Sequence, residues 1–224
     1  MNVLNSLLKK DPNQATPLHY GAQQGFMKVC KLYQELIDVQ DKYGETPIHY
    51  AVASSFYQSS NLLPFLISLT KNPNAPNFMK QTPLHVAIAN EGTSPKSTQW
   101  QIQIISILAK TGQNLNLQDS QGLTPLHYAV SHYNEDMFEN IVNLIDPISS
   151  INIRDNDDMK PLDMALEDCN EHAVRVLTPL TEDLTIAEET RNHPAYVGNV
   201  KFSACLKIID EHQRERELLS NSNH

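Results

Sequence analysis

The motif Thr-Pro-Leu/Ile-His recurs four times in this chain and constrains its fold more than any other feature. It reads "ATPLHYGA" from Ala15, "ETPIHYAV" from Glu45, "QTPLHVAI" from Gln81 and "LTPLHYAV" from Leu123. A fifth copy, "KPLDMAL" from Lys160, keeps the proline and the leucine but has neither the threonine nor the histidine. Five near-copies of one short motif predict a repeat architecture in which each copy belongs to one structural unit.

The spacing of the copies is that of a helical repeat protein. The first motif position falls at Thr16, Thr46, Thr82, Thr124 and Lys160, in steps of 30, 36, 42 and 36 residues. Five residues before these positions stand Asp11, Asp41, Asn77, Asp119 and Asp155. Twice the full string is D-x-x-G-x-T-P, so a turn precedes each motif.

Each copy predicts a turn followed by a short helix. Threonine is a good N-cap, and proline is well tolerated at the first helical position. Leu18 and Ala22 lie four residues apart and share a helix face. Asp and Gly before the threonine are turn residues, and Gly permits positive φ. Where Gln14, Lys80 and Asp158 replace that glycine, we expect a strained or reshaped turn.

A second apolar helix follows each of the first four motif helices. The segments are "FMKVCKLYQELI", "SSNLLPFLISL", "WQIQIISILAK" and "DMFENIVNLI". A single helix pair cannot bury its apolar face, but a stack of pairs can. Pro64 should kink the second of these helices or shift its start. The third repeat is long, and we place its surplus in a surface loop at 91–99, "EGTSPKSTQ".

On these motifs the chain resembles the ankyrin-repeat family, whose signature is T-P-L-H-x-A with a period of about 33 residues. The resemblance implies an all-α solenoid of about five helix-turn-helix repeats with β-turn tips and helical capping at both ends. We place the array at 1–177, with a cap helix over 1–10 and repeats that start near 11, 41, 77, 119 and 155. Residues 178–224 form a C-terminal helical cap or tail, in which Phe202, Leu206 and Ile209 share a stripe.

The resemblance also implies a structural role for the motif histidines, His19, His49, His85 and His127. In the family this histidine hydrogen-bonds neighbouring backbone turns. One histidine in each repeat places the four about one repeat apart, which does not suit a metal site.

Composition narrows the partners and the compartment. The net charge is −9 and the pI about 5.4, which argues against sequence-independent binding of nucleic acid and against docking on an anionic membrane. No apolar run reaches the roughly 18 residues that span a bilayer. Cys30, Cys169 and Cys205 are odd in number and show no CxxC pair, so we expect free thiols in a reducing compartment. We therefore expect no signal peptide, a cytoplasmic protein, and a monomer when unbound.

The candidate catalytic groups are few. Cys205 and His212 lie two helical turns apart, too far for a hydrogen bond within one helix, and Cys169 and His172 lie at i and i+3. Carboxylates gather at Glu182, Asp183, Glu188 and Glu189, where a solvated helix face is the simpler interpretation. No glycine-rich phosphate-binding motif is present. We predict no catalytic residues, no metal and no cofactor.

What remains is surface. In an ankyrin array the turn tips and the first helices line one concave side. The predicted partner-binding residues are Lys42, Tyr43, Glu45, Phe78, Met79, Gln81, Gln121, Leu123, Ser131, His132, Asn156 and Met159. Large apolar residues at tips that should be wet, with polar neighbours, resemble the core and rim of an interface.

The predicted function is therefore a non-catalytic scaffold that binds a partner protein through its concave surface. One alternative is a regulatory or inhibitory subunit that masks a basic partner surface, and another is an enzyme that uses the C-terminal region. The polar tail "DEHQRERELLSNSNH" is similar to those of ankyrin proteins that intracellular bacteria export by type IV secretion. That similarity predicts an effector delivered into the cytoplasm of a host cell.

Overall fold

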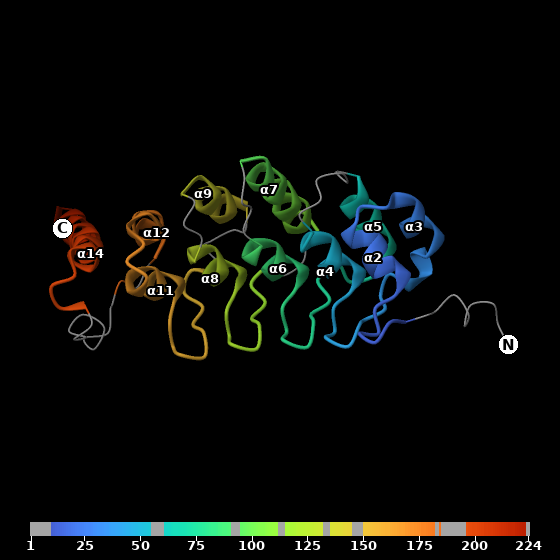
Figure 1. Ribbon diagram of the computed structural model, residues 1–224. Coiled ribbons are helices and arrows are strands. Elements are labelled where there is room, and N and C mark those ends of the chain that lie inside the picture. The colour runs from blue at the N-terminus through green and yellow to red at the C-terminus, as the bar shows by residue number, and fades with distance from the viewer. Residues whose placement is uncertain are drawn as a thin grey trace. The chain divides into compact units, whose positions relative to one another are not determined.

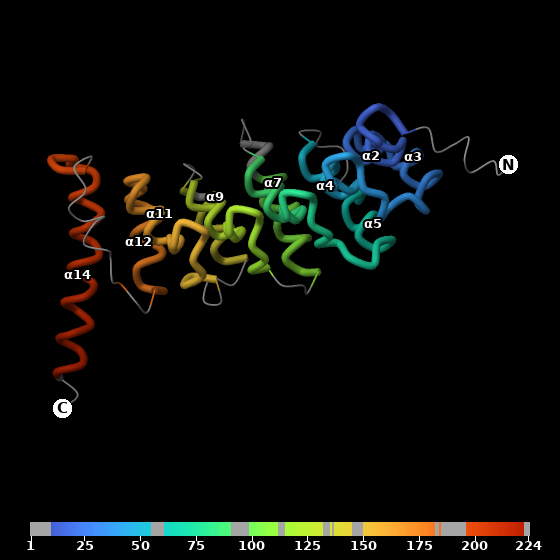
Figure 2. The backbone as a smooth tube through the Cα atoms, turned by 90° about the horizontal axis from the view of Figure 1, so that it is seen from below, coloured from blue at the N-terminus to red at the C-terminus, as the bar shows by residue number. Residues whose placement is uncertain are grey.

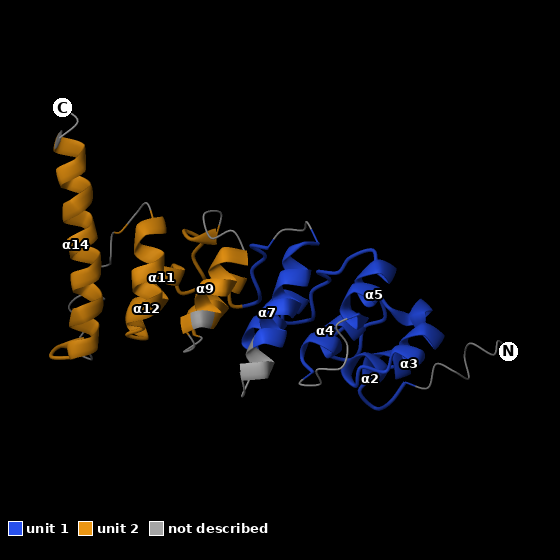
Figure 3. Cartoon of the chain, turned by 90° about the horizontal axis from the view of Figure 1, so that it is seen from above, with its two compact units in different colours: residues 1–120 blue, residues 121–224 orange. Residues whose placement is uncertain are grey.

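The computed structural model describes residues 10–54, 61–90, 95–111, 115–131, 135–144, 150–181, 184 and 196–222. Within these ranges the chain forms eleven α-helices and two short 3-10 helices, and no β-strand. The predicted all-α class is confirmed. The chain divides into two compact units, residues 1–120 and 121–224 (Figure 3). The expected cap helix at 1–10 lies outside the described residues, apart from Lys10.

The first unit consists of three helix pairs. The motif helices are α2 (Pro17–Gln23), α4 (Pro47–Val52) and α6 (Pro83–Ala89). Their partners are α3 (Met27–Leu32) with the 3-10 helix η1 (Gln34–Leu36), α5 (Leu62–Leu69) and α7 (Pro95–Ala109). Helix α4 packs against both α2 and α6, so the pairs stack, and the loops before α4 and α6 lie on one side (Figure 1). Leu18, Ile48 and Leu84 fill the interior of the stack.

The second unit continues the pattern with two pairs and a long final helix. Its elements are α8 (Pro125–Val130), α9 (Glu135–Leu144), α11 (Pro161–Glu167), α12 (Glu171–Leu177), the 3-10 helix η2 (Thr178–Leu180) and α14 (Val200–Ser222). Helix α11 packs on α8 and α12 packs on α9, so the fifth repeat stacks on the fourth. Ala129 and Ala165, which hold the same position in the two motif helices, are fully buried.

Each complete motif forms the same cap at the start of its helix. The threonine is the N-cap, proline occupies the first turn, and the histidine stands at the third helical position. In the usual capping box an acidic or amide side chain at that position accepts from the N-cap amide. Here the histidine Nδ1 accepts the hydrogen bond, at 3.0 Å from Thr16 N and 3.1 Å from the other three threonine amides. The same nitrogen lies 2.8–3.0 Å from the threonine hydroxyl.

The second ring nitrogen of the histidine reaches the next repeat. The Nε2 atoms of His19, His49 and His127 lie 3.1 Å from the backbone oxygens of Glu45, Gln81 and Met159. Because a carbonyl oxygen can only accept, Nε2 carries a hydrogen. Because Nδ1 accepts the threonine N–H, it carries none. The ring is therefore neutral and in one tautomer, and it ties the start of its own helix to the following turn. The structural role that the resemblance implied is confirmed for these three histidines.

The fifth copy of the motif replaces both partners of the cap. Lys160 is the N-cap and is buried, and its N–H donates to Asp163 Oδ2 at 3.0 Å. A carboxylate in the first turn also interacts favourably with the helix dipole. An ionised carboxylate has no hydrogen to donate to a following turn. The fifth copy therefore keeps the cap of its own helix without the hydrogen bond that the histidine donates in the other repeats.

Two local expectations have different outcomes. Pro64 lies in the first turn of α5, where a backbone N–H would have no partner within the helix. Pro64 therefore shifts the start of the helix and does not kink it. The loop predicted over 91–99 is wrong for 95–99, because α7 begins at Pro95. Proline has the fixed φ of a first helical residue, and sequence length alone cannot show whether a surplus extends a helix or a loop. Residues 91–94 lie outside the described ones.

Helix α14 covers the end of the last repeat. It packs on α12 and α11, and its buried stripe consists of Phe202, Cys205 and Ile209. Leu206, which we expected in that stripe, is half-buried beside it. The boundary proposed at residue 177 between array and tail stays a prediction.

Protonation of His49 should weaken the fold at mildly acidic pH. Burial lowers the pKa of His49 from 6.5 to about 4, and it lowers the pKa of His19 as well. Between these two values the unfolded chain binds more protons than the folded one. The free energy of unfolding should therefore fall as the pH falls from about 6.5 to about 4, by roughly 3 kcal/mol for His49.

Urea unfolding at about pH 7 and about pH 4.5 measures this loss. The control is His49→Gln, whose amide can still donate to Gln81 O but does not titrate. The variant should lose less stability than the natural chain over this pH interval. An equal loss in both would show that His49 is not a source of the pH dependence.

Candidate protein-binding surface

Each turn closes around one aspartate or asparagine. Asp41 Oδ1 accepts the N–H groups of Tyr43 at 2.8 Å and Glu45 at 2.9 Å, while Asp41 N donates to Glu45 O at 3.0 Å. The same bonds surround Asp11, Asn77 and Asp155. This pattern explains why an acidic or amide residue recurs five positions before the motif. It also fixes the backbone of the two residues at the tip.

The fourth residue of each turn has positive φ. It is Gly44 at 79° and Gly122 at 80°, but also Gln14 at 62°, Lys80 at 58° and Asp158 at 64°. The turn shape is therefore kept where glycine is replaced, and the cost is backbone strain of about 1 kcal/mol for each residue. At Gly44 space is also lacking, because an added Cβ would lie 2.6 Å from Phe78 N and from the Phe78 ring.

Neighbouring tips are tied together by backbone hydrogen bonds. In the first unit the donor and acceptor pairs are Lys42 N to Asn13 O at 2.8 Å, Phe78 N to Tyr43 O at 2.9 Å and Ser120 N to Met79 O at 2.8 Å. In the second unit Asn156 N donates to Gln121 O at 3.0 Å. Figure 2 views the first unit from the side on which its turns lie. Within each unit the tips are held in fixed register.

The first unit brings three large apolar side chains together at adjacent tips. Tyr43 is 54% exposed, Phe78 is 69% exposed and Met79 is 55% exposed. Lys42 is also exposed, and its Nζ lies 4.8 Å from the centroid of the Tyr43 ring. These four predicted site residues are presented to solvent on two hydrogen-bonded turns. We call Lys42, Tyr43, Phe78, Met79 and the neighbouring Lys80 the tip surface.

Four predicted site residues are less accessible than the tips. Glu45, Gln81, Leu123 and Met159 occupy the same position, just before the helix N-cap, and all are half-buried. The chain turns inward there, because the N-cap residue that follows is buried. Burial, followed by the nearby Asp41, raises the pKa of Glu45. Leu123 and Met159 are therefore not fully wet apolar tips of the kind that we expected.

The described tips of the second unit are polar. Gln121 and Asn156 are exposed, and so is Ser131 at the C-cap of α8. Asp157 and Asp158 continue the tip of the fifth repeat, where Asp158 forms a 3.3 Å ion pair with Arg154. His132, another predicted site residue, lies outside the described residues.

Sequence reasoning missed Lys80 as a surface group. We interpreted it only as a replacement for the turn glycine, yet it is exposed directly beside Phe78 and Met79. Its charge, two residues from an aromatic tip, was the signal that could have identified it.

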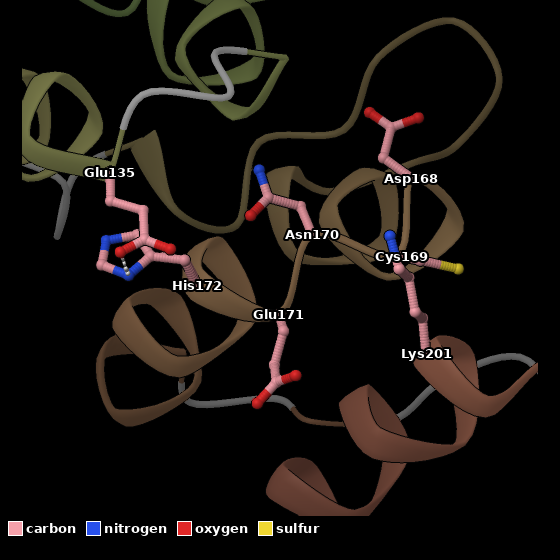
Figure 4. A pocket seen from close by; sticks show the side chains of 7 residues that line it. All are labelled: Glu135, Asp168, Cys169, Asn170, Glu171, His172 and Lys201. Atoms are coloured by element: carbon pink, nitrogen blue, oxygen red, sulfur yellow. Dashed lines mark ion pairs between the residues drawn. The ribbon is translucent and has the colours of Figure 1, made fainter.

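The second unit contains a pocket of about 310 Å³. Its lining residues are Glu135, Asp168, Cys169, Asn170, Glu171, His172 and Lys201 (Figure 4). His172 lies between two glutamates, with Nδ1 3.7 Å from Glu135 and Nε2 3.4 Å from Glu139, the latter without hydrogen-bond geometry. The Cys169 thiol points away from the imidazole and instead accepts from Asn199 Nδ2 at 3.6 Å.

Cys205 and His212, the second candidate catalytic pair, also have different surroundings. Cys205 is fully buried, and burial raises the pKa of its thiol to about 11. His212 Nδ1 lies 3.9 Å from Glu215. The acidic cluster of Glu182, Asp183, Glu188 and Glu189 lies outside the described residues.

The described part of the chain holds neither a candidate metal site nor a candidate membrane span. Nowhere in it do three histidine, cysteine or acidic side chains converge in a way that could hold a metal ion. Nor does any helix in these ranges combine the length and the apolar character needed to cross a bilayer.

Stacked helix pairs, joined by hydrogen-bonded turns that present side chains to solvent, define a helical repeat protein. The family model described as "Ankyrin repeats (3 copies)" matches residues 1–77, 53–149 and 96–187. The chain belongs to the ankyrin-repeat family, and these repeats indicate a scaffold for protein–protein interaction.

The sequence of the chain is similar to parts of several longer proteins. Human Inversin is 29% identical over 157 residues, which are 68% of this chain and 14% of Inversin. Mouse NF-kappa-B inhibitor delta is 31% identical over 140 residues, 58% of this chain and 39% of that protein. The target of rapamycin complex 2 subunit AVO2 of Saccharomyces cerevisiae is 25% identical over 179 residues, 73% of this chain and 39% of the subunit. The matched region is thus less than half of each of these relatives.

Replacing Gly44 by alanine should disturb the tip surface from beneath. The left-handed backbone costs alanine about 1 kcal/mol, and the overlap with the backbone of Phe78 adds roughly 1–3 kcal/mol. Gly198→Ala is the matched control, since Gly198 has φ 79° but open space around it. Chemical denaturation should show a clearly larger loss for Gly44→Ala, and equal losses would contradict the contact with Phe78.

The three thiols should differ in reactivity in the folded chain. Cys30 and Cys205 are fully buried, and burial raises the pKa of each to about 11, whereas Cys169 is partly exposed. A disulfide reagent at about pH 8 should therefore label Cys169 first, because only thiolate reacts. Peptide mapping by mass spectrometry identifies the labelled residue, and Cys169→Ser should remove the fast phase. Rapid labelling of Cys205 would show that the packing of α14 on α12 and α11 does not protect this thiol.

Proposed function

We propose that this chain is a non-catalytic scaffold that holds a partner protein at the turn tips of its repeats. The observation that carries the proposal is the exposure of Tyr43, Phe78 and Met79 on two turns joined by the hydrogen bond from Phe78 N to Tyr43 O. Water meets three large apolar side chains at one place in the first unit. A bound partner would remove that apolar area from water.

The construction of the turns supports binding at this place. Side-chain bonds from Asp41 and Asn77 fix the tip backbones before any partner arrives. Association therefore need not order these loops, and more of the contact energy is available for affinity. Aromatic side chains that become buried at the centre of an interface usually supply most of that energy.

The non-catalytic part of the proposal is supported by the surroundings of the reactive groups. Cys169 lies against Asn199, and His172 lies against two glutamates. A nucleophile needs a base within hydrogen-bond reach. In the described residues Cys169 does not have His172 as its partner, and Cys205 does not have His212.

A second candidate function is a regulatory or inhibitory subunit that masks a basic partner surface. The exposed Asp157 and Asp158 at the tip of the fifth repeat favour it, together with the net charge of −9. One of the similar proteins is itself named an inhibitor. Under this alternative, replacing both aspartates by asparagine should weaken binding, and the apolar tips of the first unit should matter little.

Delivery of the chain into a host cell by a bacterium is also a proposal, and it rests on the polar C-terminal tail. A translocation reporter fused to the chain, with and without residues 210–224, tests it. Unchanged delivery without those residues would count against a signal in the tail.

Removing the aromatic tips should weaken capture of the partner while leaving the fold intact. We expect Tyr43→Ala with Phe78→Ala to weaken binding by about 2 kcal/mol or more, or about thirtyfold. Thermal stability should change little, because both side chains are more than half exposed. Quantitative mass spectrometry of proteins captured from candidate cell lysates measures the loss against the natural chain.

Gln103→Ala is the control, since Gln103 is exposed on α7, away from the turns. Partners kept by this variant but lost from the double variant bind at the tips. Unchanged capture by the double variant would place the site elsewhere. Unfolding of the double variant would show that the tips are part of the core.

A further inference from the structure

The charge at the tip surface is opposite in sign to that of the whole chain. Lys42 and Lys80 are both exposed and flank the apolar tips. Neither forms an ion pair within 4.0 Å with a carboxylate in the described part of the chain. Lys42 lies over the Tyr43 ring, which leaves the outer side of its ammonium open to another anion. Two positive charges therefore stand in a chain whose net charge is −9.

The carboxylates of the turn that carries Lys42 and of the turn before it are already engaged in the fold. Asp41 is only 3% exposed and accepts from two backbone amides and from Tyr50 Oη. Asp11 accepts from two backbone amides and from Tyr20 Oη, and it faces Lys42 only at longer range. Glu45 is half-buried. In the third repeat the turn residue is the neutral Asn77, so the turn that carries Lys80 has no framework carboxylate.

The arrangement of the tips favours an extended ligand. The hydrogen bonds from Phe78 N to Tyr43 O and from Ser120 N to Met79 O fix consecutive turns beside each other. Charged and apolar side chains are therefore presented together on two neighbouring turns whose backbones are fixed. An extended segment can meet successive points with successive side chains, whereas a helix would present only one face.

We infer that the tip surface binds an extended, acidic polypeptide segment that also carries a large apolar side chain. This inference rests on the proposed function, because it names the chemistry of the partner at that same surface. The acidic side chains of the segment pair with Lys42 and Lys80, and its apolar side chain packs between Tyr43, Phe78 and Met79. Such charge complementarity contributes chiefly to specificity and to the rate of association.

A random twelve-residue peptide library displayed on phage tests the inference with the full chain as bait. Enriched peptides should be acidic and contain a large apolar residue. A synthetic peptide of the enriched sequence should then bind about tenfold more weakly to the double variant Lys42→Gln with Lys80→Gln. Raising the salt concentration from about 50 to about 500 mM should weaken peptide binding by the natural chain far more than peptide binding by this variant.

The glutamine variant is chosen to preserve the fold. Gln14 already adopts φ 62° at the turn position where Lys80 has φ 58°, so glutamine tolerates that backbone. The matched control is Lys28→Gln with Lys31→Gln, which removes two exposed charges from α3 in the same unit. This control should bind the peptide as the natural chain does.

The outcomes separate this inference from the proposed function. Neutral or basic peptides that still require Tyr43 and Phe78 would overturn the inference and leave the tips as the binding site. Peptides that bind Tyr43→Ala with Phe78→Ala equally well would overturn both. Failure to enrich any peptide would overturn an extended ligand. A dimer in sedimentation that the glutamine variant dissociates would show that a second copy of the chain is the occupant.

Discussion

The rest of the structure depends on the hydrogen bond from the motif histidine to the turn of the following repeat. One nitrogen of the ring closes the cap of its own helix, and the other donates to a backbone oxygen one repeat further on. The bond at Nδ1 requires the neutral ring, because a protonated Nδ1 could not accept the threonine N–H, and burial favours the same neutral form. The same contact therefore begins a helix, sets the spacing between repeats and brings the tips into register.

Much of this fold could be predicted because each motif residue performs a task that few other residue types can perform. Threonine and proline predict the start of the helix, and the recurring aspartate predicts the turn. The exposure of the site was harder to predict. Tyr43 and Leu123 both flank a turn glycine, yet only Tyr43 stands out in solvent, because the chain bends toward the buried N-cap at the position of Leu123. The length of α7 was missed because a surplus of residues does not reveal whether it is helical.

The repeats separate the residues that fold the chain from those that can recognise a partner. Asp41, Thr46 and His49 point inward and hold the turn and the cap. The tip residues between them contribute little to the core, so their chemistry is free to vary from one repeat to the next. The first unit presents lysines with aromatic side chains, whereas the described tip of the fifth repeat presents aspartates. Under the proposed function, the local charge at the tips, more than the net charge of the chain, decides which partners fit.

The pairing of Lys160 with Asp163 limits how this array could have grown. Repeat arrays lengthen when a stretch of the gene is duplicated, and any complete copy can be inserted beside another. A duplicate of the fifth repeat would carry Asp163 in place of the histidine, so it could not donate a hydrogen bond to the turn of the repeat that follows it. A copy of an upstream repeat would bring the histidine and its bond to the next turn with it. Lys160 and Asp163 thus keep the start of the helix but give up the link between neighbouring repeats.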